Sequence, residues 1–480
     1  MRSMTGTPST GPELYRYQEL AARLARAIDS GALRAGERLP SVRALCTQER
    51  LSISTVMQSL ARLEFQGYVE SRPRSGTFVR ARRVLPAPAA TQPVSTSRPI
   101  TMSGLVARIA AANRDPRLVP LSAGVPTAAL LPEAPLARAL AAAAHGGIAS
   151  EPPQGFAGLR RAVAHRAVTW GVTVAPDDVL ITAGTTEAVF LALRAVTAPG
   201  DSVAIESPTY RGGLQTLEAL GLRAVQVPCD PSTGMDVDAL AAILDRQRLA
   251  AVLASPNFSN PVGGLMPDAA KRRLARLLAE REVPLVEDDV FGDLSLDDRR
   301  PPPVKAFDRE GWVLTCGSFS KTLCPGWRVG HVLPGRFAER VLQLKYALNV
   351  STASAVQRAL ARFLETGAYD RHLRRLRAAL RAGLERTSAT ITATFPPGTR
   401  VSRPAGGCVV WVELPRSVDA LALHERALAG GVALEPGHVF GPRGEYAHFI
   451  RLAYCHGWDD RVRRAVERVG RLAWELAEAR

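Results

Sequence analysis

A lone lysine stands in the segment GSFSKTLCPGWRVG, which runs from residue 317 to residue 330. The chain contains 61 lysines and arginines, but only four of them are lysines: Lys271, Lys305, Lys321 and Lys345. Arginine stays protonated and cannot form an imine, whereas a lysine that loses its proton can attack a carbonyl carbon. The rarity of lysine therefore makes Lys321 a candidate for imine chemistry.

Other reactive groups follow short apolar runs in the carboxy-terminal part of the chain. From about residue 119 such runs alternate with helical patterns, which is typical of a mainly parallel sheet covered by helices on both faces. Ligands of these α/β folds bind at the carboxyl ends of the strands. The predicted strands are VLITAG (179–184), SVAIES (202–207), AAVLAS (250–255), VPLVEDD (283–289) and GWVLTCGS (311–318).

The residues at these strand ends complement one another chemically. Thr185 and Thr186 open a helix, where hydroxyls and free N–H groups suit a phosphate. Tyr210 offers an aromatic face, Asn260 an amide, and VPLVEDD ends in two carboxylates. Pyridoxal 5′-phosphate needs all of these groups as well as a lysine. Its phosphate takes hydroxyls and an arginine, its ring a stacking partner, and its pyridine nitrogen a carboxylate that keeps it protonated.

Residues from about 119 to 480 resemble the fold-type I aminotransferases, with SFSKTLCPGWRVGH as the most specific match. The resemblance implies that Lys321 forms the Schiff base and that Asp288 meets the pyridine nitrogen. It also implies that Asn260 bonds O3′, that Tyr210 stacks on the ring, and that Arg451 of FIRLAY clamps a substrate α-carboxylate. The implied phosphate ligands are Thr185, Thr186, Ser318, Ser320 and Arg328. No metal site is expected.

Each of these roles has an alternative, and two positions depart from the family pattern. Asp289 could replace Asp288, Tyr210 could be a core aromatic, and Arg451 could be structural. Phe291 stands where these enzymes usually have a tyrosine that bonds O3′. Ser150 stands where a tyrosine usually reaches the partner subunit's cofactor. Both losses are compatible with cofactor binding and less compatible with complete transamination.

The amino-terminal part of the chain is basic and has a different organisation. Residues 1–83 hold 14 arginines and 7 acidic residues. An amphipathic helix pattern ends at Gly31, and Ser41 and Ser52 can each cap a short helix after it. Residues 68–70 and 77–79 read as two strands around a basic tip. These proportions predict a winged helix-turn-helix, although a small helical domain with a solvated basic face would show a similar pattern.

RLPSVRAL, SISTVMQSLARLEFQGYVE and RSGTFV resemble the winged helix-turn-helix of the GntR regulators over residues 13–80. The second short helix would present hydroxyls and an amide near its amino end, which can bond phosphates and base edges. Arginines of the module would hold the DNA backbone through salt-dependent contacts. The candidate DNA-binding residues are Arg43, Ser52, Ser54, Thr55, Gln58, Arg72 and Arg74.

The sequence thus predicts an α/β, fold-type I aminotransferase-like domain (119–480) preceded by a small winged helix-turn-helix domain (1–80). Residues 81–118 are the expected linker, of which residues 80–100 are rich in Pro, Ala, Ser and Thr and read as flexible. This order resembles the MocR subfamily of GntR regulators across nearly the whole chain.

The MocR resemblance implies a homodimer that binds double-stranded operator DNA and senses a small amine, an amino acid or pyridoxal phosphate itself. Amine binding that releases Lys321 would change domain closure. A working aminotransferase with a DNA-binding head is the main alternative, and a regulator that no longer uses the cofactor is a second. No apolar run is long enough to cross a membrane, and the six cysteines form no CxxC pair. A cytoplasmic protein is therefore expected.

Overall fold

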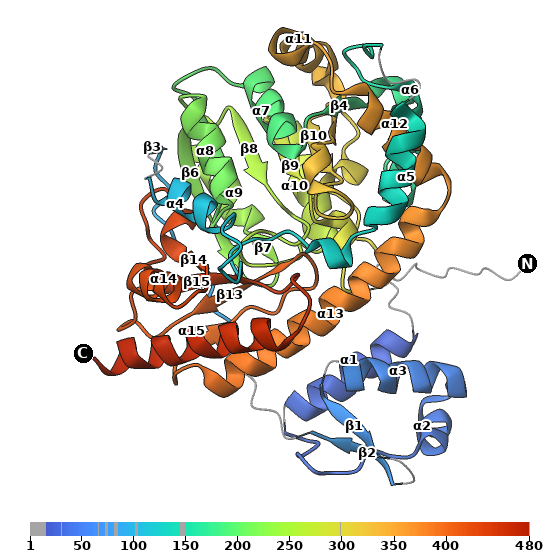
Figure 1. Cartoon of the computed structure of the whole chain (residues 1–480), viewed down its shortest axis with the longest axis vertical. Helices are drawn as coiled ribbons and strands as arrows, with labels where there is room; N and C mark the ends of the chain where they lie inside the picture. Colours follow the sequence, from blue (N-terminus) through green and yellow to red (C-terminus); the bar gives the residue numbers. More distant parts are fainter. Residues whose placement is uncertain are drawn as a thin grey trace, which may run out of the picture. The chain divides into compact units, whose positions relative to one another are not determined.

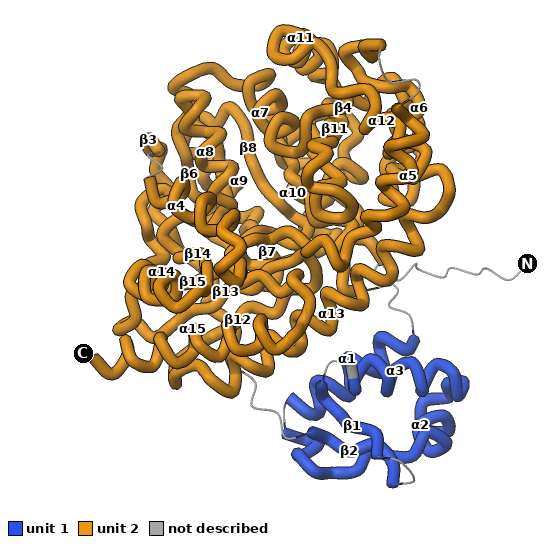
Figure 2. The backbone as a smooth tube through the Cα atoms, viewed as in Figure 1, with its two compact units in different colours: residues 1–84 blue, residues 85–480 orange. Residues whose placement is uncertain are grey.

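The computed structural model divides the chain into two compact units, residues 1–84 and 85–480 (Figure 2). It describes residues 16–29, 31–65, 67–72, 75–80, 85–100, 104–144, 149–297 and 299–479. Within these ranges, no helix is long and apolar enough to cross a membrane.

The first unit has the predicted helix-turn-helix and wing. Helices α1 (Arg16–Asp29), α2 (Val42–Glu49) and α3 (Ile53–Phe65) precede the antiparallel strands β1 (Val69–Arg72) and β2 (Gly76–Val79). Ser41 Oγ accepts the backbone N–H of Ala44 at 3.2 Å, and Ser52 Oγ accepts that of Thr55 at 3.2 Å. Both predicted caps are confirmed, and they fix where α2 and α3 begin.

The second unit is built on a mainly parallel sheet, which confirms the predicted fold class (Figure 1). Within the described residues the strand order is β3-β6-β5-β8-β9-β10-β11-β4, with β7 (Gly234–Met235) beside β6. Strand β11 (Gly330–Leu333) runs antiparallel to both of its neighbours. The other strands are β3 (Arg98–Pro99), β4 (Leu180–Thr182), β5 (Ser202–Ser207), β6 (Arg223–Asp230), β8 (Ala251–Ala254), β9 (Leu285–Asp288) and β10 (Val313–Ser318).

Alternating strand residues bury both faces of this sheet. Val203 and Ile205 of β5 pack in one apolar cluster with helices α7 (Thr185–Val196), α8 (Arg211–Ala219) and α11 (Ala338–Asn349). Ala204, between them, packs in another cluster with α9 (Val237–Arg246) and α10 (Asp268–Glu280). A third cluster joins α5 (Glu133–Ala144), α6 (Ala157–Thr169) and α12 (Ser354–Glu365). Helices on both faces leave the strand ends as the place for a ligand.

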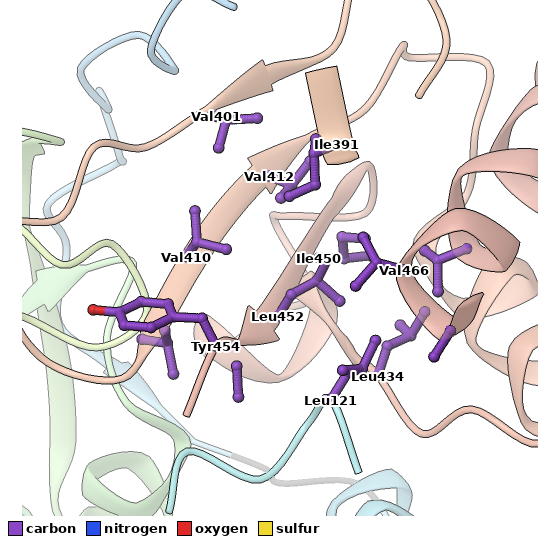
Figure 3. Packing of buried hydrophobic residues seen from close by; sticks show 14 of the residues in the cluster. Leu121, Ile391, Val401, Val410, Val412, Leu434, Ile450, Leu452, Tyr454 and Val466 are labelled. Carbon is purple, nitrogen blue, oxygen red and sulfur yellow. The ribbon is translucent and has the colours of Figure 1, made fainter. Parts of the chain in front are cut away.

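A smaller antiparallel sheet carries residues that approach the pocket described below. Its order is β12 (Arg400–Val401), β13 (Val409–Glu413), β15 (Phe449–Ala453) and β14 (Glu435–Pro436). Helices α13 (Ala368–Thr394), α14 (Ala420–Ala429) and α15 (Asp460–Glu478) pack on it. Figure 3 shows part of this core, including Val412, Ile450 and Leu452. Because β14 and β15 are in register, Glu435 faces Arg451 across the ladder.

The prediction of a flexible connector is wrong for residues 85–100, which belong to the second unit. Strand β3 (Arg98–Pro99) pairs with β6. Thr91 donates its hydroxyl to the carbonyl of Ser207 at 2.6 Å, and Ser95 donates to that of Gln226 at 2.7 Å. The serine and threonine hydroxyls that suggested a linker therefore hydrogen-bond to backbone carbonyls of strands β5 and β6. Helix α4 (Leu105–Ala112) follows, while residues 81–84 and 101–103 lie outside the described residues.

Candidate functional site

A cavity of about 200 Å³ lies at the carboxyl ends of the parallel strands. Strands β4, β5, β8, β9 and β10 each deliver at least one lining residue at or just after their last position. The structure brings all nine predicted cofactor residues to this one cavity: Thr185, Thr186, Tyr210, Asn260, Asp288, Ser318, Ser320, Lys321 and Arg328. The sheet topology thus assembles residues that are up to 143 positions apart, from 185 to 328.

One end of the cavity offers donors suited to a phosphate. Thr185 Oγ1 and Ser320 Oγ are buried and have no hydrogen-bond partner within the described residues. Thr185 is the first residue of α7, so free backbone N–H groups lie beside its hydroxyl. The guanidinium of Arg328 lies against Gly184, where a Cβ would come within 2.6 Å of its Nη2. Hydroxyls, a helix start and an arginine fit a phosphate group.

The two adjacent acids at the end of β9 have different surroundings. Asp288 lines the cavity, and burial raises the pKa of its carboxyl to about 6, an effect that the nearby Lys321 opposes. Asp289 instead accepts a hydrogen bond from Asn257 Nδ2 at 2.8 Å and pairs with Arg300. The side chain of Asp289 is thereby used within the protein, which leaves Asp288 as the acid that can meet a ligand.

Lys321 is the one lysine of the chain that opens into the cavity. Its Nζ donates a hydrogen bond to the carbonyl of Gly124 at 2.9 Å and lies 5.9 Å from the centre of the Phe291 ring. Lys271 and Lys345 are fully buried. Lys305 is nearly so and pairs with Asp308 at 2.9 Å. Their positions agree with structural roles for these three lysines.

Sequence reasoning missed Glu206, which lines the cavity from the end of β5. Its Oε2 accepts the backbone N–H of Ser255 at 3.0 Å, while Oε1 is buried without a partner within the described residues. Burial, and to a lesser extent the neighbouring Asp288, raise the pKa of Glu206 to about 7, an effect that the hydrogen bond from Ser255 opposes. The signal was present in SVAIES as an acid at the end of an apolar strand.

Arg451, the predicted carboxylate clamp, does not line the cavity. Its Nη1 donates to Asn260 Oδ1 at 3.0 Å, and its Nη2 contacts the carbonyl of Ser122 and the carboxylate of Glu435. Glu435 also pairs with Arg211, the residue after Tyr210. Sequence reasoning missed Glu435 because it stands within the otherwise apolar run GVALEPG.

The two positions that depart from the family pattern lie in different places. Phe291 lines the cavity, and its ring has no hydroxyl, unlike the tyrosine that the aminotransferases usually have at this position. Ser150 does not line it, and its hydroxyl lies 3.1 Å from that of Ser351. Neither side chain therefore supplies a polar contact to the cavity within this chain.

The first unit presents its candidate DNA contacts on the surface. Arg43, Ser52, Ser54, Gln58 and Arg72 are exposed, and Thr55 is half-buried. Ser52 Oγ lies 2.9 Å from Ser54 Oγ and 2.8 Å from Thr55 Oγ1, so the hydroxyls cluster at the start of α3. Arg72 pairs with Glu70 at 2.6 Å and lies over the Phe78 ring. Arg74 lies outside the described residues.

Comparisons with known proteins define both parts of the chain. Residues 16–79 match the family model for bacterial regulatory proteins of the gntR family, and residues 116–469 match that for aminotransferases of class I and II. A DNA-binding module of one class is therefore joined to an aminotransferase-like domain of another.

Curated relatives have this same two-part organisation. The chain is 35% identical to the HTH-type transcriptional regulator YjiR of Escherichia coli, over 96% of this chain and 100% of that protein. It is 37% identical to YdcR of the same organism, over 96% and 99% respectively. The chain belongs to the MocR subfamily of GntR transcriptional regulators, in which a winged helix-turn-helix is fused to an aminotransferase-like domain.

Solved structures agree with the assignment of the second unit to the aminotransferases. The α-aminoadipate aminotransferase LysN of Thermus thermophilus, complexed with N-(5′-phosphopyridoxyl)-L-leucine, is 30% identical, with a TM-score of 0.72 over 79% of this chain and 100% of that chain. An aspartate aminotransferase from the same organism is 27% identical, with a TM-score of 0.69 over 78% and 97%. The cofactor that this family and the cavity residues indicate is pyridoxal 5′-phosphate.

Proposed function

We propose that the protein regulates transcription by binding operator DNA through its first unit and a small amine through its cofactor-loaded second unit. The observation that carries this proposal is the meeting of all nine predicted cofactor residues in one cavity of a chain that also has a GntR module. Two buried hydroxyls without partners, on Thr185 and Ser320, support the cofactor assignment. The cytoplasm is the compartment that suits such a role.

The positions of the side chains support a role for each of them. Bound pyridoxal phosphate supplies an aldehyde that reacts with amines and a ring that withdraws electrons. We assign Lys321 the role of holding the aldehyde carbon, and Asp288 that of keeping the pyridine nitrogen protonated. Tyr210 provides a stacking face and Asn260 an amide for O3′, while the hydroxyls and Arg328 hold the phosphate. Glu206 adds a second acid beside Asp288, at the part of the cavity assigned to the pyridine nitrogen.

A ligand that displaces Lys321 would affect the neighbouring segment of the small sheet. Lys321 Nζ is hydrogen-bonded to the carbonyl of Gly124. The segment that leads to Gly124 is joined to the small sheet, since Ala453 donates its N–H to Leu121 O at 2.7 Å and Val119 bridges to Val432. In the cofactor-loaded chain Nζ would be held by the aldehyde carbon, and an amine that displaces the lysine would return Nζ to the carbonyl of Gly124. We propose that this exchange of Lys321 between the cofactor and Gly124 is the local event that signals ligand binding.

We further propose a homodimer, with a contact surface at the end of α11. Tyr346, Leu348 and Val350 are 58%, 55% and 53% exposed, and large apolar side chains gathered on a surface mark interaction sites. Val350 has φ +57°, which is strained for a β-branched residue. Asn349, beside it, bonds Glu187 in the first turn of α7. A second copy on this surface would therefore touch the helix whose start forms the phosphate site.

A complete aminotransferase is the second candidate function, favoured by the presence of every predicted cofactor residue. It is also favoured by a relative named 2-aminoadipate transaminase, from Thermus thermophilus, which is 33% identical over 74% of this chain. Multiple turnovers by purified cofactor-loaded protein, supplied with an amino donor and a keto acid, would establish this function in place of sensing alone.

Binding to the DNA upstream of the gene tests the regulatory function. The full chain should bind this DNA in a gel-shift assay, and addition of pyridoxal phosphate with an amine should change the affinity. Binding that is the same with and without the cofactor and the amine would remove the proposed coupling. Absence of any specific binding would contradict the regulatory role itself.

A further inference from the structure

We infer that Glu435 withholds Arg451 from ligands, so that the cavity selects amines that lack an α-carboxylate over α-amino acids. The inference deepens the proposed sensing of an amine and rests on it. It comes from the cluster Arg211–Glu435–Arg451, which is defined here by its two ion pairs and called the arginine–glutamate cluster.

Backbone pairing places Glu435 opposite Arg451. The two residues are direct partners in the ladder between β14 and β15. Arg451 is 3% exposed and Glu435 is fully buried. Within such an environment an ion pair is hardly screened by solvent, and separating its members leaves an uncompensated buried charge. The pair is therefore expected to persist when a ligand enters the neighbouring cavity.

The Nη2 donors of Arg451 are committed within the protein, while Nε has no hydrogen-bond partner among the described residues. Nη1 donates to Asn260 Oδ1 at 3.0 Å. Nη2 is used by the carbonyl of Ser122 and by Glu435. A ligand carboxylate needs two parallel N–H groups to form a bidentate pair with an arginine. A bidentate pair would use Nη2 together with either Nη1 or Nε, and both hydrogens of Nη2 already have acceptors. Arg451 also does not line the cavity.

Arg211 holds Glu435 from the other side. Its Nε pairs with the Glu435 carboxylate, and its side chain is 17% exposed. A glutamate bound by two arginines is harder to displace than one bound by Arg451 alone. The cluster carries one net positive charge, and Arg211 is its partly exposed member, where solvent can hydrate part of that charge.

An α-amino acid and its decarboxylated amine should therefore differ in affinity. The carboxylate of the amino acid would compete with Glu435 for Arg451, or it would lie close to the Glu435 carboxylate, which carries the same negative charge. The amine avoids both costs. Because a hydrogen bond to a charged group contributes about 1.5–3 kcal/mol, the expected preference for the amine is roughly 10- to 100-fold.

Calorimetric titration of the cofactor-loaded full chain tests this preference directly. Leucine and 3-methylbutylamine form a matched pair that differs only in the carboxylate. The wild-type protein should bind 3-methylbutylamine at least about 10-fold more tightly than leucine. Equal affinities, tighter binding of leucine, or no binding of either compound would each overturn the inference.

Substitution of Glu435 should reverse the order. In Glu435→Ala, Arg451 loses its competing carboxylate, so the affinity for leucine should rise by about 10-fold or more while that for 3-methylbutylamine stays unchanged. Glu435→Gln keeps the shape of the side chain and removes its charge, and it should show a smaller change in the same direction. Glu467→Ala removes a glutamate paired with Arg463 at 2.6 Å on α15 and serves as the control. Unchanged leucine affinity in both Glu435 variants would contradict the role of Glu435.

Gel shifts with the same variants separate this inference from the proposed function. If wild-type DNA affinity responds to 3-methylbutylamine and that of Glu435→Gln responds to leucine, both proposals hold. A DNA affinity that ignores both compounds, combined with the predicted calorimetric order, would sink only the regulatory coupling. The reverse calorimetric order with a DNA response intact would sink only the inference about Glu435.

Discussion

Lys321 should be the residue that holds the cofactor covalently. In Lys321→Ala the cofactor loses its only amine anchor in the cavity, so the visible absorbance of a protein-bound imine should vanish. Absorption spectra of the purified variant and of the wild type, after removal of free cofactor, check this. Lys305→Arg, which keeps the ion pair with Asp308, is the control and should retain the band. An imine band that survives in Lys321→Ala would contradict the assignment.

Glu206 should make the stability of the apo-protein depend on pH. Its pKa is raised by burial from its usual 4.5 to about 7, so between these values the folded chain holds a proton that the unfolded chain has released. Unfolding therefore releases a proton, and the free energy of unfolding should fall as pH rises from about 4 to 8, by roughly 3 kcal/mol in all.

Glu206→Gln has no proton to release and should lose this part of the pH dependence. Urea unfolding at pH 5 and pH 8 should show the variant gaining stability relative to the wild type at the higher pH. Glu467→Gln, which changes a half-buried glutamate on α15, is the control. A stability difference between Glu206→Gln and wild type that is the same at both pH values would show that Glu206 does not hold the proton.

Residues in the cavity differed in how well the sequence revealed them. Lys321 was predictable because lysine is rare here and the flanking serines and arginine fit a phosphate. Glu206 and Glu435 were not predicted, because a single acid inside an apolar run gives no spacing pattern. The role of Glu435 depends on strand register, which places it beside an arginine 16 positions later in the chain.

At the scale of elements, the wing and the recognition helix α3 should contribute differently to DNA binding. Arg72 at the end of β1 carries one positive charge and is expected to neutralise one phosphate. Arg72→Ala should weaken binding to specific and non-specific DNA alike and reduce the slope of log affinity against log salt by about 1. Fluorescence anisotropy at several salt concentrations measures this slope. Arg471→Ala, which removes an exposed arginine from α15, should leave it unchanged.

Gln58 on α3 should act on sequence preference instead. A glutamine amide can bond a base edge and carries no charge, so Gln58→Ala should lower the affinity for the operator by about 1–3 kcal/mol. Its affinity for unrelated DNA and its salt slope should stay close to those of the wild type. A uniform loss on all DNA would assign Gln58 to the backbone instead of the bases.

The elements themselves were largely predictable, with one failure. The apolar runs gave the parallel strands, and serine caps gave α2 and α3, because both are local signals. The bonding of residues 85–100 to the sheet was not predicted, because a free linker and a segment bonded to strands can have the same content of Pro, Ser and Thr. Only the positions of the carbonyls on β5 and β6 distinguish the two cases.

At the scale of the whole molecule, the exposed end of α11 should hold two chains together. Leu348→Glu places a charge in the proposed contact, where it would be buried without a partner, and should shift the protein towards monomer. Analytical ultracentrifugation of the cofactor-loaded protein measures the change. Val168→Glu alters an equally exposed apolar residue on α6 and should leave the assembly unchanged. A Leu348→Glu protein with wild-type sedimentation would exclude this surface.

The burial of three of the four lysines has a practical consequence for protein chemistry. Reagents that acylate or reductively methylate amines can reach Lys321 from the cavity, whereas Lys271 and Lys345 are fully enclosed and Lys305 is nearly so. The native protein therefore offers such reagents one side-chain amine besides its terminal amine. Loading the cofactor first would block Lys321 and leave the terminal amine for the reagent. A spectroscopic probe can therefore be directed to either position.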